Sequence, residues 1–199
     1  MKIIGITGQS GSGKGHLSAQ FEKLGYIHAD ADKIYHGLLA SNAELKAELV
    51  CAFGKDILSN GEIDRKALGR KVFGTENARK LLKLNKIAHK YVAREYISLI
   101  RKLKSEGAKG IIIDAPLLIE ARLDKICDTT VFVAADRETR IMRIMARDNL
   151  DRAAALLRID SQKDESFYAK HCKHIFINNG SEDASIFAAD IDKLLEADN

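Results

Sequence analysis

The chain has 199 residues, which is enough for one well-packed domain. It is 46% hydrophobic and 30% charged, which excludes a disordered chain, and its net charge of +4 is weak support for nucleic-acid binding. No apolar run approaches the roughly 20 residues that span a bilayer, and the N-terminal "MKIIGITG" meets glycine too early for a signal peptide. We therefore expect a cytoplasmic protein that binds neither membranes nor nucleic acids.

Five short apolar runs, bounded by turn residues, predict the strands of a parallel sheet. They are rich in β-branched residues and rarely alternate with polar ones, as expected of strands buried on both faces. The runs are "KIIGIT" (2–7), "YIHA" (26–29), "GIIIDA" (110–115), "TTVFVAA" (129–135) and "HIFIN" (174–178). The longer amphipathic stretches between them predict helices, and therefore an α/β fold with a doubly wound sheet.

Two longer stretches interrupt this alternation. The first, 31–106, carries Leu, Ile and Ala at helical spacing and no convincing strand, which predicts a helical insertion. The second, 137–162, is charged and also helical in pattern. No repeat or linker divides the chain, so we expect a single domain. The three cysteines have no metal-type spacing and are expected to be reduced; they are Cys51, Cys127 and Cys172.

A glycine-rich loop follows the first predicted strand. The segment "GITGQSGSGKGH" matches the phosphate-binding pattern of Gly, four residues and Gly-Lys, with Gly8, Gly13 and Lys14 in place. In such a loop (8–15, here called the phosphate loop), backbone N–H groups and the following helix bind phosphate, and the lysine reaches the β- and γ-phosphates. The alternative is a tight turn with a solvated lysine, and the strand-loop-helix context favours phosphate binding.

Gly15 departs from this pattern, because the usual residue there is Ser or Thr, whose hydroxyl coordinates Mg²⁺. Glycine supplies no ligand, although a water molecule could take the position. His16 does not readily replace the hydroxyl, since Mg²⁺ prefers oxygen ligands. We expect nucleotide binding to be retained and metal positioning to be weakened.

Carboxylates follow two of the predicted strands. Asp30 and Asp32 follow the second strand, at the edge where open α/β sheets bind ligands. Asp32 is the candidate general base, and Asp30 is a candidate supporting or helix-capping residue. Asp114 ends the third strand and is a candidate for the metal or its water shell, the alternative being an ordinary turn residue.

Arginines recur in the second helical stretch. Arg140, Arg143 and Arg147 have helical spacing and share a face, and Arg158 lies on the next helix. Such arginines can neutralise a phosphoryl group during transfer, or they can form a solvated charged face. The phosphate loop and the carboxylates favour the first interpretation for at least one of them.

Taken together, these segments resemble the dephospho-CoA kinase family over nearly the whole chain. The similar segments, in order, are "GITGQSGSGK", "LGYIHADADKI", "AFGKDILSNGEIDRKALGRKVF", "LNKIAHKYV", "IIIDAPLLIE", "RIMRIMARDNLDRAAALLRIDSQ" and "HIFINNGS". The resemblance implies a P-loop NTPase fold with a five-stranded parallel sheet flanked by helices. It implies a core of about 1–31, 107–136 and 172–199, a helical CoA-binding region of about 32–106 and a lid of about 137–171.

The same resemblance implies an activity and its cofactors. The family transfers the γ-phosphate of ATP, with Mg²⁺, to the ribose 3′-hydroxyl of dephospho-CoA, giving CoA and ADP. The implied catalytic residues are Asp32, Lys14 and Arg140, with Asp114 near the metal, through water. ATP would contact Gly8, Gln9, Ser10, Gly11, Ser12, Gly13, Lys14, Gly15, His16 and Arg147. Dephospho-CoA would contact Asp32, His89, Leu117, Leu118 and Glu120. We expect a monomer or a weak homo-oligomer.

The sequence departs from the family pattern in three places. Gly15 replaces Ser or Thr, Lys90 replaces the proline after His89, and Gln9 and Ser10 replace a small and apolar pair, which should disturb the loop little. Gly15 supports one alternative, a catalytically weakened or non-catalytic nucleotide-binding paralogue. A kinase of another small molecule is disfavoured by the "DADKI" and "APLLIE" segments, and RNA binding by the lack of an aromatic stacking motif.

Overall fold

The computed structural model describes residues 1–180 and 182–197, which form two compact units. The boundaries of the first unit are Met1–Asp30 and Lys102–Asn199, and those of the second unit are Ala31–Arg101. Among the described residues, no helix combines the length and the apolar character needed to cross a bilayer.

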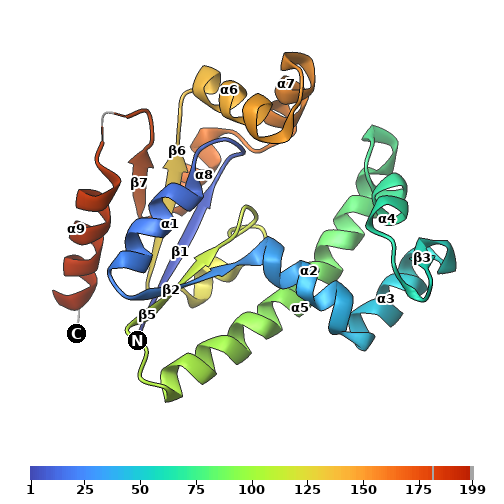
Figure 1. Cartoon of the computed structure of the whole chain (residues 1–199), viewed down its shortest axis with the longest axis horizontal. Coiled ribbons are helices and arrows are strands. Elements are labelled where there is room, and N and C mark those ends of the chain that lie inside the picture. The colour runs from blue at the N-terminus through green and yellow to red at the C-terminus, as the bar shows by residue number, and fades with distance from the viewer. Residues whose placement is uncertain (181, 198–199) are drawn as a thin grey trace. The chain divides into compact units, whose positions relative to one another are not determined.

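The first unit is built on a five-stranded parallel sheet (Figure 1). Its strand order is β2-β5-β1-β6-β7. The strands are β1 (Lys2–Gly8), β2 (Tyr26–Asp30), β5 (Gly110–Asp114), β6 (Thr129–Ala134) and β7 (His174–Ile177). All five predicted strands are confirmed, each to within one residue at either end, and so is the parallel arrangement.

Helices cover this sheet on both faces. Helices α1 (Lys14–Lys23) and α9 (Ala184–Ala197) pack on one face, and α8 (Glu165–His171) packs on the other. Helices α6 (Arg137–Asp148) and α7 (Arg152–Asp160) pack on each other in a separate apolar cluster, and η3 (Leu123–Ile126) is a 3-10 turn. Helix α1, blue in Figure 1, packs against the red C-terminal helix α9. Adjacent side chains of β6 point to opposite faces of the sheet. Val131 and Val133 pack in the cluster with α1 and α9, and Phe132 packs beside Tyr168 of α8.

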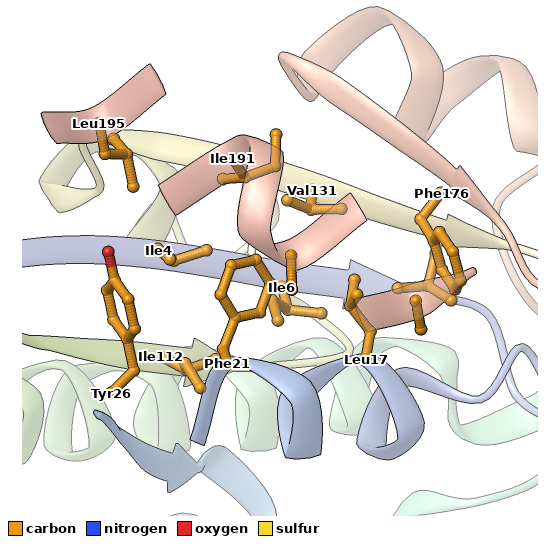
Figure 2. Packing of buried hydrophobic residues seen from close by; sticks show 13 residues of the cluster. Ile4, Ile6, Leu17, Phe21, Tyr26, Ile112, Val131, Phe176, Ile191 and Leu195 are labelled. Atoms are coloured by element: carbon orange, nitrogen blue, oxygen red, sulfur yellow. The ribbon is translucent and has the colours of Figure 1, made fainter. Parts of the chain in front are cut away.

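The main apolar core lies between the sheet and the α1 and α9 helices (Figure 2). Phe21 of α1 is fully buried and meets the ring of Tyr26 edge-on, with ring centroids 5.7 Å apart. Ile4 and Ile6 of β1 are fully buried in the same cluster, and α9 contributes Ile191. Because β1 is buried in this core, the phosphate loop that follows it starts from a fixed position.

The second unit is mainly helical. It contains α2 (Ala31–Ser41), α3 (Ala43–Phe53), η1 (Lys55–Ile57), α4 (Arg65–Val72), η2 (Thr75–Asn77) and most of α5 (Ala78–Ser105). One detail of the sequence-based expectation is wrong, because β3 (Leu58–Ser59) and β4 (Glu62–Ile63) form a short antiparallel ladder. Asn60 and Gly61 take left-handed conformations between the two strands. An Asn-Gly pair is a typical hairpin turn, and this is the signal that the helical pattern around it obscured.

Side chains cap the starts of several helices. Asn42, Asp64, Asp151 and Asp164 accept backbone N–H groups at the starts of α3, α4, α7 and α8. Helix α1 differs, because its N-cap residue is Gly13 and no described side chain caps it. The first N–H groups of α1 are therefore available to an anion.

Candidate active site

The phosphate loop connects β1 to α1 and turns at two glycines. Gly11 and Gly13 have φ values of 79° and 88°, in the left-handed region that glycine adopts without strain. A β-carbon at Gly8 would lie 2.6 Å from the carbonyl oxygen of Val133, so the end of β1 also needs a glycine. The geometry is that of an anion-binding nest that leads into a helix N-terminus.

Lys14 lies at the start of α1 and folds back along the loop. Its Nζ lies 3.4 Å from the carbonyl oxygen of Gly8, a long hydrogen bond. The hydroxyl of Ser12 is buried over Gly8 and has no hydrogen-bond partner among the described residues. The loop thus offers N–H groups, an ammonium group and an unsatisfied hydroxyl, all of which suit phosphate oxygens.

Gly15 occupies the second position of α1, and its surroundings are open. A β-carbon there would meet no atom within 4 Å, in contrast to Gly8, Gly11 and Gly13, whose β-carbons would clash. Its φ is not in the left-handed region. Neither packing nor backbone geometry therefore requires glycine here, and a serine would fit.

His16 follows the phosphate loop in α1, and its side chain is exposed. It lines a cavity of about 500 Å³ together with Gln20 and Lys23 of α1 and the residues 182–185 that lead into α9. The structure places His16 on the face of α1 that looks toward α9, and it gives no direct support to the predicted ATP contact of this residue.

Arg140 of α6 is buried against the phosphate loop. Its side chain donates to the carbonyl oxygen of Ser10 at 3.1 Å, to Oε1 of Gln9 at 2.7 Å and to Oε1 of Gln162 at 3.3 Å. The residue is only 5% exposed, and burial lowers the pKa of its guanidinium. The structure therefore brings Arg140 to the loop, where it binds the outer side of the loop backbone.

Gln9 and Ser10 add a second connection, between the loop and residues 162–163. Gln9 donates to the carbonyl oxygen of Lys163 at 2.8 Å. Oε1 of Gln162 accepts the backbone N–H of Ser10 at 2.9 Å, and Nε2 of Gln162 donates to the Ser10 hydroxyl. These contacts fasten the tip of the loop to the segment between α7 and α8.

Asp114 ends β5 and is held by two polar side chains. Nε2 of His28, on the neighbouring strand β2, lies 3.2 Å from Oδ2 of Asp114, and the Ser18 hydroxyl of α1 donates to the same oxygen at 3.4 Å. The hydrogen bond to Asp114 raises the pKa of His28, although burial acts in the opposite direction. The carboxylate is nearly buried at the end of its strand, and its predicted place near the metal stays a prediction.

Arg147 and Arg158 do not join the loop in this structure. Both pair with Asp148, and both side chains are more than two-fifths exposed. The helical face shared by Arg140, Arg143 and Arg147 thus divides into two inner arginines that contact the loop and an outer one on the surface. The predicted ATP contact of Arg147 stays a prediction.

The predicted substrate residues lie in both units. Asp32 is exposed in the first turn of α2, and His89 is partly buried in α5, where burial lowers its pKa. In the segment after β5, Leu117 and Glu120 are exposed. Leu118 is fully buried and would clash with a β-carbon at Gly5, so core packing accounts for it.

The structure adds functional candidates that the sequence-based reasoning did not assign. Gln162 and Asn178 contact the loop, while His28 and Ser18 contact Asp114. His28 could have been noticed as a histidine within an otherwise apolar strand. Gln162 carries no such signal, because its role depends on the path of the chain between α7 and α8.

Comparison with known proteins gives one consistent result. The family model described as dephospho-CoA kinase matches residues 2–184. A dephospho-CoA kinase of Carboxydothermus hydrogenoformans is 37% identical over 182 residues, which is 91% of this chain and 87% of that protein.

Two solved structures agree with this match. The protein TT1252 from Thermus thermophilus has a TM-score of 0.78 at 31% identity, covering 98% of this chain and 97% of the other. A dephospho-CoA kinase from Campylobacter jejuni has a TM-score of 0.69 at 27% identity, covering both chains completely. The P-loop kinase fold is thereby confirmed, and the chain belongs to the dephospho-CoA kinase family.

Proposed function

We propose that this protein transfers the γ-phosphate of ATP to the ribose 3′-hydroxyl of dephospho-CoA, giving CoA and ADP. The observation that carries the proposal is the phosphate loop, with left-handed Gly11 and Gly13, an uncapped helix behind it and Lys14 folded along it. The family match supports the acceptor.

A cavity of suitable size for the nucleoside of ATP lies next to the loop. This cavity of about 620 Å³ is lined by Gln9 of the loop, by Asp136, Arg137 and Arg140 at the start of α6, and by residues of the 159–165 segment. Ligand sites of this kind are usually a few hundred Å³ with a few polar groups. We assign it to the adenosine moiety, because the phosphates would then extend along the loop.

The acceptor region is assigned to the second unit. A cavity of about 680 Å³ there is lined by apolar residues, including Leu39, Leu68 and Val72, and by polar residues such as Arg65. The hydroxyl of Tyr35, which also lines it, is buried without a hydrogen-bond partner among the described residues. An elongated substrate with both amide and aliphatic parts, such as dephospho-CoA, suits this combination.

In the proposed mechanism, each group has one task. Asp32 accepts the proton of the attacking hydroxyl, and Lys14 and the loop N–H groups stabilise charge on the phosphates. Mg²⁺ fits Asp114, because it prefers oxygen ligands and keeps several waters, and when bound it neutralises phosphate charge. His28 and Ser18 hold the Asp114 carboxylate in place.

An ADP-release assay tests this function. ATP and Mg²⁺ are supplied with and without dephospho-CoA, and the acceptor product is identified by its added phosphoryl group. We expect ADP release that depends on dephospho-CoA and falls about 10²- to 10⁴-fold in Asp32→Asn, because general base catalysis contributes this much. Unchanged activity in Asp32→Asn would remove Asp32 from the mechanism.

Gly15 supports one alternative function, that of a paralogue with weakened or absent catalysis. It predicts a folded protein that binds ATP and yet releases no ADP in the presence of dephospho-CoA. The open space at Gly15 makes the two cases separable, because Gly15→Ser adds the missing hydroxyl without a clash. Activity that appears only in that variant would support the weakened paralogue.

A further inference from the structure

The outer side of the phosphate loop is bound by donors from two distant segments. Nη1 of Arg143 lies 3.3 Å from the carbonyl oxygen of Gly11 and 3.2 Å from that of Ser12. Nδ2 of Asn178, just after β7, donates to the same Ser12 carbonyl at 2.8 Å. With the bond from Arg140 to the Ser10 carbonyl, three successive peptide carbonyls are held from outside the loop.

Arg143 and Asn178 also hold each other. Nη2 of Arg143 donates to the carbonyl oxygen of Asn178 at 3.0 Å, and the backbone N–H of Asn178 donates to the carbonyl oxygen of Ala134 at 2.8 Å. That last bond continues the pairing of β6 with β7, so the sheet fixes the position of Asn178. The brace on the loop is therefore attached to both α6 and the sheet.

The same neighbours explain why two loop positions are glycine. A β-carbon at Gly13 would lie 2.2 Å from Nδ2 of Asn178, and one at Gly11 would lie 2.6 Å from the carbonyl oxygen of Arg140. The loop is thus packed tightly against α6 and Asn178 on its outer side, in addition to needing positive φ values at these residues.

This arrangement has a direct consequence for phosphate binding. In a trans peptide the C=O and N–H groups point in opposite directions. Holding the Ser10 and Ser12 carbonyls outward therefore turns the N–H groups of Gly11 and Gly13 toward the inner side of the loop. The N–H of Ser12 is used within the loop, since it donates to the carbonyl oxygen of Gln9 at 3.1 Å.

We propose that Arg143, together with Asn178, is a positioning residue that preorganises the phosphate loop by binding its carbonyls from behind, without contacting the nucleotide. The proposal rests on the proposed ATP binding of this loop. The guanidinium of Arg143 has several N–H donors in a fixed planar arrangement, and it reaches two loop carbonyls and Asn178 at once. The role of Arg143 therefore depends on this geometry more than on its charge.

The test measures ADP affinity by calorimetry in four variants. Arg143→Met removes both the guanidinium donors and the positive charge, whereas Arg143→Lys keeps the charge alone. Asn178→Ala removes one donor to the Ser12 carbonyl. Arg152→Met is the matched control, because Arg152 lies on the neighbouring helix, is exposed and pairs with Glu138 without touching the loop. Thermal unfolding of each variant checks that it is folded.

We expect the Kd for ADP to rise about tenfold in both Arg143 variants, because hydrogen bonds from a charged donor are lost. In Asn178→Ala the Kd should rise about threefold, because the lost donor is neutral. The control should stay within about twofold of the wild type, which is the effect of a surface change. Binding of adenosine, followed by ligand-observed NMR, should not change in any variant, because adenosine has no phosphate for the loop.

Three results would overturn the proposal. They are wild-type ADP affinity in Arg143→Lys, equal losses in Arg143→Met and Arg152→Met, and an equal loss of adenosine and ADP binding. If Arg143→Met does not fold, Arg143→Lys and Asn178→Ala decide the question. ADP binding requires no acceptor, so a lack of dephospho-CoA turnover would contradict the proposed function and leave this test intact.

Discussion

Nη1 of Arg140 donates to Oε1 of Gln9 at 2.7 Å, and this bond joins the buried arginine of α6 to the second residue of the phosphate loop. Gln9→Ala removes the acceptor from a buried charged donor, and such hydrogen bonds contribute about 1.5–3 kcal/mol. We expect the free energy of unfolding, measured in urea without nucleotide, to fall by about 1–3 kcal/mol.

Gln20→Ala is the matched control for this change. Gln20 lies on α1, and within the described part of the chain its side chain accepts only an exposed hydrogen bond from Lys23. Its loss should therefore change stability by less than about 0.5 kcal/mol. Equal effects of the two substitutions would contradict the role of Gln9 as the partner of Arg140.

The second prediction concerns Gly15. Gly15→Ser and Gly15→Ala should both fold with an unchanged or higher Tm, because the site is open and glycine is a poor helix former. Only Gly15→Ser should lower the Mg²⁺ concentration for half-maximal ADP release, by about tenfold, the lower end of measured effects around metal sites. If the alanine variant gave the same gain, helix stabilisation would explain it and the hydroxyl would be irrelevant.

The third prediction concerns Asp114 and the metal. Asp114→Asn keeps the shape of the side chain and removes its charge, so the Mg²⁺ needed for half-maximal turnover should rise about tenfold or more. ADP affinity measured without metal should stay close to that of the wild type, because the loop binds the phosphates. An unchanged Mg²⁺ requirement would exclude Asp114 from the metal site.

The fourth prediction is a pH dependence of stability. Burial lowers the pKa of His89, so folding favours its neutral form. The contribution of neutral His89 to stability is complete above its pKa in the unfolded state, about 6.5. This contribution is lost as the pH falls from there through the lower pKa of His89 in the folded state. We expect His89→Gln to weaken the loss of unfolding free energy between about pH 7 and 5, measured by urea titration. Parallel pH curves for the two proteins would contradict this.

The elements of the fold were predictable where the pattern was local. The apolar runs predicted the strands, and the glycine-rich motif predicted the loop between β1 and α1. The Asn60-Gly61 hairpin was missed, because two-residue strands carry too few side chains to show a period of two.

The candidate site was predictable only in part. Lys14 and Asp114 lie where the motif and the strand end implied, but the contacts of Arg140, Arg143, Gln162 and Asn178 link segments more than 100 residues apart along the chain. Such contacts depend on how α6 and β7 pack on the sheet. No local pattern encodes that packing, and the sequence therefore could not show which arginine of the helical face meets the loop.

We infer that the phosphate loop is a working nucleotide site although Gly15 lacks a hydroxyl. Calorimetric titration of ATP, in the wild type and in Lys14→Ala, tests it most directly. We expect saturable one-to-one binding in the wild type and at least about tenfold weaker binding in the variant, because a charged donor to phosphate is lost. Absence of binding in the folded wild type, or equal affinity in the two proteins, would contradict it.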